Sequence, residues 1–159
     1  MIVSGVGKME NIKNKTVFLV ETVLKETNTQ VNAPRYIYGI EEAGIFFVNE
    51  IGNNSVECFY VMYMNTANEL VAMSEIAKGD ATNVVLSIGE VIRIGILSNA
   101  KYILLAHNHP SGVAKPSESD VEMTKKIAQA ASLLNMHLVD SIIVCGNGSL
   151  YSMRKTIAK

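Results

Sequence analysis

The stretch that decides the fold runs from Leu105 to Asp120 and reads LAHNHPSGVAKPSESD. It continues the apolar run 102–106, which predicts a short strand that is buried on both faces. Pro110 ends this strand, because proline cannot donate a hydrogen bond to a β-ladder. Ser117 is a favoured residue at the N-cap of a helix. The stretch therefore predicts strand, loop and helix in succession. Three polar side chains lie at their junction: His107, His109 and Asp120.

These three side chains form a candidate zinc site. Residues two apart on a strand point the same way, so His107 and His109 can present both imidazoles to one point. The small residues of the loop 111–114 let the chain fold back closely, and the first turn of the helix brings Asp120 towards the strand end. Two neutral nitrogens and one carboxylate oxygen leave the fourth position of Zn²⁺ open, which is typical of catalytic sites. Zinc lowers the pKa of the water that it binds to about 7.

Each part of this pattern also has an ordinary structural interpretation. The sequence Ser117-x-x-Asp120 is a variant of the capping box, and a single histidine at a strand end is usually satisfied by hydrogen bonds. The complete string favours a metal site, because His-x-His is followed after seven residues by Ser-x-x-Asp. A cap and a ligand set can coexist, since the carboxylate of Asp120 can serve both.

The rest of the chain predicts an α/β fold with a mixed β-sheet flanked by helices. Helices are expected at 40–51, where Gly52 is a natural end, from 88 to 99 after a capping box at Ser87 and Glu90, and from 117 to 134. Strands are expected at 16–25, 57–64, 69–76, 102–106, 136–145 and 149–152. We predict a mobile arm at 1–15, one domain at 16–153 and a frayed basic tail at 154–159.

Composition limits the classes of function. The chain has 159 residues, which suits one domain, and its net charge of −1 provides no general attraction for nucleic acid. No apolar segment has the length of a membrane span or the pattern of a signal peptide, so no membrane contact is expected. Cys58 and Cys145 lie in apolar runs and are predicted to be buried free thiols. A cytoplasmic location is the expectation.

The stretch resembles the metal-binding motif of the JAMM metallopeptidase family, also called JAB or MPN. The wording HNHPSG is similar to the bacterial RadC branch, and the resemblance runs from about Ile40 to the ending DSIIVCGNGSLYS at 140–152. It implies a three-layer fold related to the cytidine-deaminase-like sheet. It also implies that His107, His109 and Asp120 are zinc ligands. Ser117 is then expected to donate a hydrogen bond to the developing oxyanion.

The resemblance further implies an upstream glutamate that acts as general base. This residue takes a proton from water and passes it to the leaving amine. Glu57 opens the strand ECFYVMYM, which is the expected place, and we predict it for this role. Glu90 is the alternative, although its position in a capping box already explains it. Glu69 and Glu75 on the next strand are less favoured.

The expected function is that of a zinc-dependent hydrolase acting on an amide, peptide or isopeptide bond, with a protein or peptide as substrate. The alternatives are a DNA repair-associated or DNA-binding protein and a non-catalytic scaffold module. Longer RadC-type proteins carry an N-terminal helix-hairpin-helix segment associated with DNA binding, and residues 1–15 are too short to replace it. His137 is interpreted as structural, and Asp140 is a candidate to orient a ligand histidine.

Overall fold

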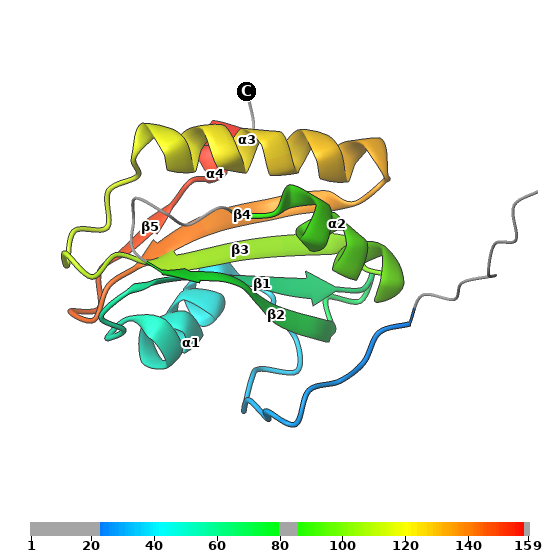
Figure 1. Ribbon diagram of the computed structural model, residues 1–159, viewed down its shortest axis with the longest axis horizontal. Helices are drawn as coiled ribbons and strands as arrows, with labels where there is room; N and C mark the ends of the chain where they lie inside the picture. Colours follow the sequence, from blue (N-terminus) through cyan, green and yellow to red (C-terminus); the bar gives the residue numbers. More distant parts are fainter. Residues whose placement is uncertain (1–22, 80–85, 158–159) are drawn as a thin grey trace, which may run out of the picture.

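The computed structural model describes residues 23–79 and 86–157 (Figure 1). Along the chain the elements are α1 (Ile40–Ile51), β1 (Glu57–Met64), β2 (Leu70–Gly79), α2 (Ile88–Leu97), β3 (Tyr102–Asn108), α3 (Glu118–Leu133), β4 (His137–Val144), β5 (Leu150–Ser152) and α4 (Arg154–Ile157). Strands and helices are mixed along the chain, as the sequence predicts.

The strands form one mixed sheet in the order β2-β1-β3-β4-β5. β1 is antiparallel to both β2 and β3, and β5 is antiparallel to β4. β3 and β4 are parallel, a pairing that needs a long crossover connection, and α3 supplies it. The sheet therefore brings the end of β3, with its two histidines, next to the loop that leads into α3.

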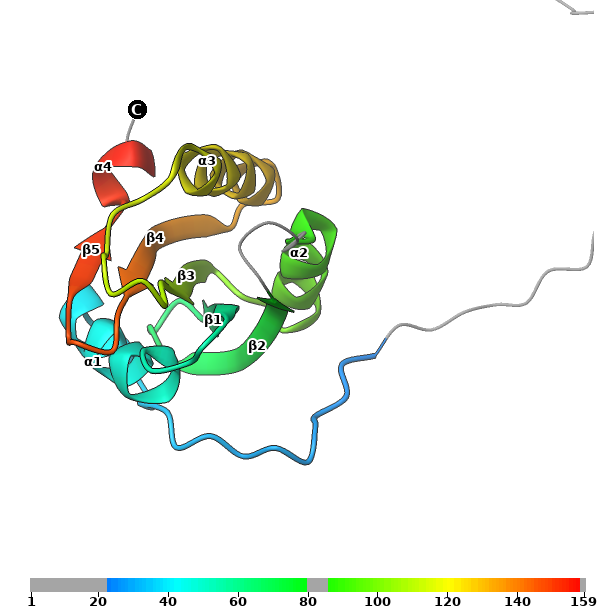
Figure 2. The same ribbon diagram turned by 60° about the vertical axis from the view of Figure 1, so that its left-hand side comes forward.

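Helices cover both faces of the sheet, and this arrangement makes three layers (Figure 2). On one face, Phe47 of α1 packs with Leu104 and other apolar side chains of the strands. On the opposite face, Ile127 of α3 packs with Ile103 and Leu105, together with side chains of α2. Successive residues of β3 thus point to opposite cores, as expected for a strand that is buried on both faces. The predicted three-layer α/β fold is confirmed.

Three expectations differ from the structure or lie outside it. The arm at 1–15 and the first residues of the strand predicted at 16–25 fall outside the described residues, whereas residues 23–25 are exposed and belong to no strand. The tail was expected to be frayed, but residues 154–157 form a helical turn that contacts α3 and β4.

No helix within the described ranges combines the length and the apolar character needed to cross a membrane.

Gly52 ends α1, but not by the left-handed conformation that often ends a helix. Its φ is −56°, in the right-handed helical region. A Cβ atom at this position would lie 2.5 Å from the carbonyl oxygen of Val48 and 3.2 Å from the carbonyl group of Cys145. Glycine is therefore required by close packing, which lets the loop after α1 pass next to the end of β4.

Candidate metal centre

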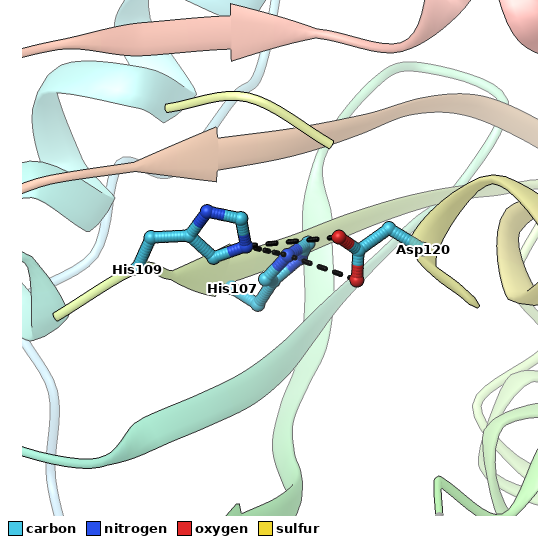
Figure 3. A group of neighbouring side chains, drawn as sticks. All are labelled: His107, His109 and Asp120. Atoms are coloured by element: carbon cyan, nitrogen blue, oxygen red, sulfur yellow. Dashed lines mark hydrogen bonds and ion pairs between the residues drawn. The ribbon is translucent and has the colours of Figure 1, made fainter. Parts of the chain in front are cut away.

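His107 and His109 lie at the C-terminal end of β3 and point to the face of the sheet that α2 and α3 cover (Figure 3). Their Nε2 atoms are 3.1 Å apart. The His107 side chain is 1% exposed and its ring stacks on Phe59 of β1, with 4.5 Å between ring centroids and 10° between ring planes. His109 is half-buried. The neighbouring strand thus positions one ring, and the other ring faces the solvent side of the site.

Asp120 in the first turn of α3 completes the group. Its Oδ1 lies 3.4 Å from His107 Nε2, and its Oδ2 lies 3.7 Å from His109 Nε2. Ser117 holds the carboxylate, because its backbone N–H and its hydroxyl donate to Oδ2 over 2.7 and 2.6 Å. In return the Asp120 N–H donates to Ser117 Oγ. The capping box and the gathering of the three side chains therefore coexist, as the sequence predicts.

The surroundings of Asp120 favour its ionised form. Burial acts to raise the pKa of this carboxyl, but the hydrogen bond and charge of His107 and the two bonds from Ser117 outweigh it. As a result the pKa lies well below the usual range. Asp120 is accordingly a carboxylate at any pH at which the fold is expected to function, and it can offer an oxygen to a cation.

The spacing of the three donors fits a tetrahedral zinc ion. Two donors on such an ion are about 3.3–3.4 Å apart when each bond is about 2.0–2.1 Å long. In this group the two Nε2 atoms are 3.1 Å apart, Oδ1 of Asp120 lies 3.4 Å from His107 Nε2, and the other oxygen, Oδ2, lies 3.7 Å from His109 Nε2. His109 Nδ1 lies 2.9 Å from the carbonyl oxygen of Val113, which only accepts, so the ring proton is on Nδ1 and the lone pair is on Nε2. With one ligand atom from each residue, the three donors lie within 4.8 Å of one another, and their chemical types are those that zinc accepts.

The partners of the other ring nitrogens correct one expectation. Asp140 does not orient either histidine: it accepts hydrogen bonds from Ser141 N over 2.7 Å and from Ser152 Oγ over 2.6 Å. His107 Nδ1 is buried and has no hydrogen-bond partner within the described ranges. The ring of His107 is therefore held by its stacking on Phe59 and by the contact of Nε2 with Asp120, and not through Nδ1.

Glu57 is the candidate base that lies at the site. It shares the face of β1 with Phe59, two residues along, and Phe59 is directly opposite His107 on β3. Glu57 also lines an open pocket of about 470 Å³ together with His109, Ser117 and Asp120. The structure therefore brings together all five residues that the sequence singled out: Glu57, His107, His109, Ser117 and Asp120.

The other glutamates have different places. Glu90 lies in the first turn of α2. Burial and the charge of Glu90 raise the pKa of Tyr63, which pairs with Ile103 near the start of β3, at the other end of this strand from the histidines. Glu69 pairs with Arg35 over 3.1 Å. Glu75 accepts a hydrogen bond from Tyr60, whose ring packs on the core at the α1 face of the sheet. None of the three lines the pocket next to the metal centre.

His137 lies away from the centre. His137 is exposed at the start of β4 and is therefore at the opposite end of the sheet from the paired histidines. Its ring lies near Tyr102, with 6.2 Å between centroids. Cys58 and Cys145 are buried free thiols, as predicted.

Two residues that orient the histidines were not found by the sequence argument. Phe59 stacks on one ring and Val113 accepts from the other. Phe59 carries a weak signal, since it lies two residues after the candidate base on the same strand. Val113 contributes only its carbonyl group, and no side-chain pattern identifies such a partner.

Comparison with known proteins places the chain in a family. A family model described as RadC-like JAB domain matches residues 37–158. A UPF0758 protein of Finegoldia magna is 40% identical over 109 residues, which are 69% of this chain and 48% of that protein. UPF0758 proteins of Streptococcus suis and Chlorobaculum parvum are 28% identical over 152 residues, or 96% of this chain and 61% and 67% of theirs. The chain thus spans about half to two thirds of these curated relatives. From the resemblance of its motif, now joined to this match over most of its length, the chain belongs to the RadC-like JAB domain family.

Proposed function

We propose that this domain is a zinc-dependent hydrolase that cleaves an amide bond, of the peptide or isopeptide type, in a protein or peptide. One observation carries the proposal. Two imidazole nitrogens and a carboxylate oxygen lie within 4.8 Å of one another, and two of these residues, His109 and Asp120, line an open pocket that Glu57 also lines. A donor set of this kind with one free position is typical of catalytic zinc.

The residues divide the work of such a reaction. His107 and His109 would hold the ion through Nε2, and Asp120 would hold it through a carboxylate oxygen. When bound, zinc supplies a Lewis acid that polarises the scissile carbonyl and lowers the pKa of water to about 7. The Glu57 carboxylate accepts the proton of the attacking water and then delivers it to the nitrogen of the leaving amine.

Ser117 has a more specific place in this scheme than the sequence indicates. Its hydroxyl has one proton, which it donates in a hydrogen bond to Asp120 Oδ2. The first role of Ser117 is therefore to orient a ligand. To donate to the oxyanion of the tetrahedral intermediate, as the family resemblance implies, the hydroxyl must turn away from Asp120 during the reaction.

The charge of the pocket supports an amide rather than a phosphodiester as substrate. Two carboxylates, Glu57 and Asp120, line the pocket together with serines, and neither lysine nor arginine is among its described lining residues. Proteins that bind nucleic acid neutralise phosphates with lysine and arginine. A peptide bond is neutral and needs no such partner, so the DNA-directed alternative has less support.

The proposal is tested with zinc analysis and a peptide-library digest of four proteins: wild type, His109→Ala, Glu57→Gln and Glu90→Gln. We expect wild type and Glu90→Gln to bind one zinc and to cleave. Glu57→Gln should keep its zinc and lose cleavage, because an amide cannot accept the proton. His109→Ala should lose zinc. Full zinc content in His109→Ala, or undiminished cleavage by Glu57→Gln, would contradict the proposal.

A further inference from the structure

We propose that Asn108, the residue between the two histidines, is a positioning residue that sets the place of Glu57 at the metal centre. It does so by joining the loop before β1 to the strand that carries His107 and His109. The inference rests on the proposed function for its catalytic consequence. Its geometric content concerns only where Glu57 lies relative to the metal.

Asn108 points away from the histidines, because successive residues of a strand face opposite sides of the sheet. It is fully buried, and its side chain makes three hydrogen bonds. Oδ1 accepts from the backbone N–H of Cys58 over 2.8 Å. Nδ2 donates to the carbonyl oxygens of Asn54 and Val56 over 3.2 and 3.1 Å. Both donors of the amide are thus used, and its oxygen is used as well.

The three bonds enclose Glu57. The carbonyl of Val56 immediately precedes this residue and the N–H of Cys58 immediately follows it, and one side chain holds both. The backbone on either side of Glu57 is therefore tied to a point one residue away from each metal-binding histidine. Movement of Glu57 away from the ligands requires these buried bonds to break, which leaves buried polar groups unsatisfied.

Asn108 acts at the point where the backbone pairing between β1 and β3 has ended, although β1 still pairs with β2 as far as Glu57 and Gly79. The β1–β3 register starts at the pair Phe59 and His107 and runs away from the site. Beyond that pair, the N–H of His109 donates to Val144 of β4 instead. The Asn108 amide thus takes over where the ladder stops. Being uncharged at every pH, it holds the loop without changing the electrostatics around Glu57 or the metal.

The consequence for the proposed reaction concerns the distance between Glu57 and the water that it must deprotonate. A general base must lie within about 2.6–3.2 Å of the proton that it takes, directly or through one water. A displacement of about 1 Å can cost about 100-fold in rate. Removal of the Asn108 amide should leave the ligands of the metal in place, since they point to the other face, but should loosen the start of β1, which carries the base and would then be held there only by its pairing with β2.

The test compares Asn108→Ala with wild type and with Asn65→Ala as matched control. Asn65 also makes three side-chain hydrogen bonds, to Ala67 N, Glu69 N and the Glu69 carboxylate, but in the turn at the far end of β1. Each protein is loaded with Co²⁺, and the pseudocontact shifts of the backbone amides at 56–58 measure their positions relative to the metal. Each is also loaded with Zn²⁺ and assayed on a peptide recovered from the library digest.

We expect Asn108→Ala to bind one metal ion per chain, to show altered shifts at 56–58, and to lose about 100-fold in kcat with little change in KM. Asn65→Ala should match wild type in all three. Unaltered shifts at 56–58 in Asn108→Ala, or loss of its metal, would overturn the inference. If Asn108→Ala does not fold, Asn108→Asp serves instead. Its carboxylate can still accept from the Cys58 N–H, but its second oxygen cannot donate to the carbonyl groups of Asn54 and Val56. The same outcomes therefore apply to this variant.

Failure of the proposed function has a different signature. In that case wild-type protein loaded with Zn²⁺ cleaves no peptide, whereas the amide shifts still report whether Asn108 holds Glu57 near the metal. Conversely, active wild-type protein with unaltered shifts in Asn108→Ala would leave the hydrolase proposal intact and refute the role of Asn108.

Discussion

Replacement of Ser117 by alanine should reveal two functions of one hydroxyl, a helix cap and a support for a metal ligand. The matched control is Ser87→Ala, because the two serines make the same cap. Ser117 Oγ accepts from Asp120 N over 3.2 Å, and Ser87 Oγ accepts from Glu90 N over 3.2 Å. Only Ser117 also donates to a carboxylate of the metal centre, over 2.6 Å.

The expected sizes follow from these contacts. Loss of the cap should cost each variant about 1 kcal/mol of unfolding free energy. In a chain of this size that lowers Tm by about 2–4 °C. Loss of a hydrogen bond to a metal ligand typically reduces metal affinity 10–100-fold. Asp120 keeps the bond from the Ser117 backbone N–H, so we expect Ser117→Ala to lose about tenfold, equivalent to about 1.4 kcal/mol.

The assay separates the two effects. Urea denaturation in the presence of a chelator measures the stability of the metal-free proteins, and zinc affinity is measured by competition with a chromophoric chelator. Ser117→Ala should be destabilised at least as much as Ser87→Ala, because it also loses the bond to the Asp120 carboxylate, whereas only Ser117→Ala should bind zinc more weakly. Equal zinc affinities in the two variants would refute the reasoning that the Ser117 hydroxyl supports Asp120.

Three further predictions concern stability. Gly52→Ala should destabilise the protein by about 1–3 kcal/mol, because its Cβ would lie 2.5 Å from Val48 O; Gly89→Ala, whose Cβ meets nothing closer than 3.9 Å, should have no such cost when both are compared by urea denaturation. Tyr63→Phe should cost about 1 kcal/mol, since the hydroxyl donates to the carbonyl of Val91 in α2; an unchanged denaturation midpoint would contradict this. Burial raises the pKa of the Asp140 carboxyl, although bonds from Ser152 and the backbone partly oppose this. The stabilisation associated with its protonated form is complete below about pH 3.9 and is lost as the pH rises through the higher pKa of the folded state. Asp140→Asn stays neutral, so its stability relative to wild type should increase from about pH 4 to pH 7; parallel pH profiles would count against this.

The features that could be predicted from the sequence are those that depend on local sequence patterns. Alternation along β3 predicted that His107 and His109 share a face, and the Ser117 cap predicted where Asp120 returns. Both are short-range properties of the backbone. The order of strands and helices followed from apolar runs and their ends in the same way, which is why most boundaries differ from the structure by only a few residues.

Contacts between distant segments could not be predicted in this way. The pairing of Phe59 with His107 depends on the register of two strands, and periodicity alone does not determine it. The wrong prediction for Asp140 has a related cause. Leu138 and Ile142 are four residues apart on β4 and would share a face in a regular strand, yet they pack in opposite cores. The register is irregular between Leu138 and Asp140, and this changes the face of the sheet to which Asp140 points. No sequence pattern predicts this irregularity.

The candidate metal ligands all come from one continuous segment, 107–120, whereas the candidate base comes from a separate strand. In the proposed reaction, metal binding and proton transfer thus depend on different parts of the chain. A single exchange at Glu57 could silence the chemistry of such a domain while its shape and its ion persist. Homologues that share this fold could in this way differ in being catalytic or only metal-binding, without any change in architecture.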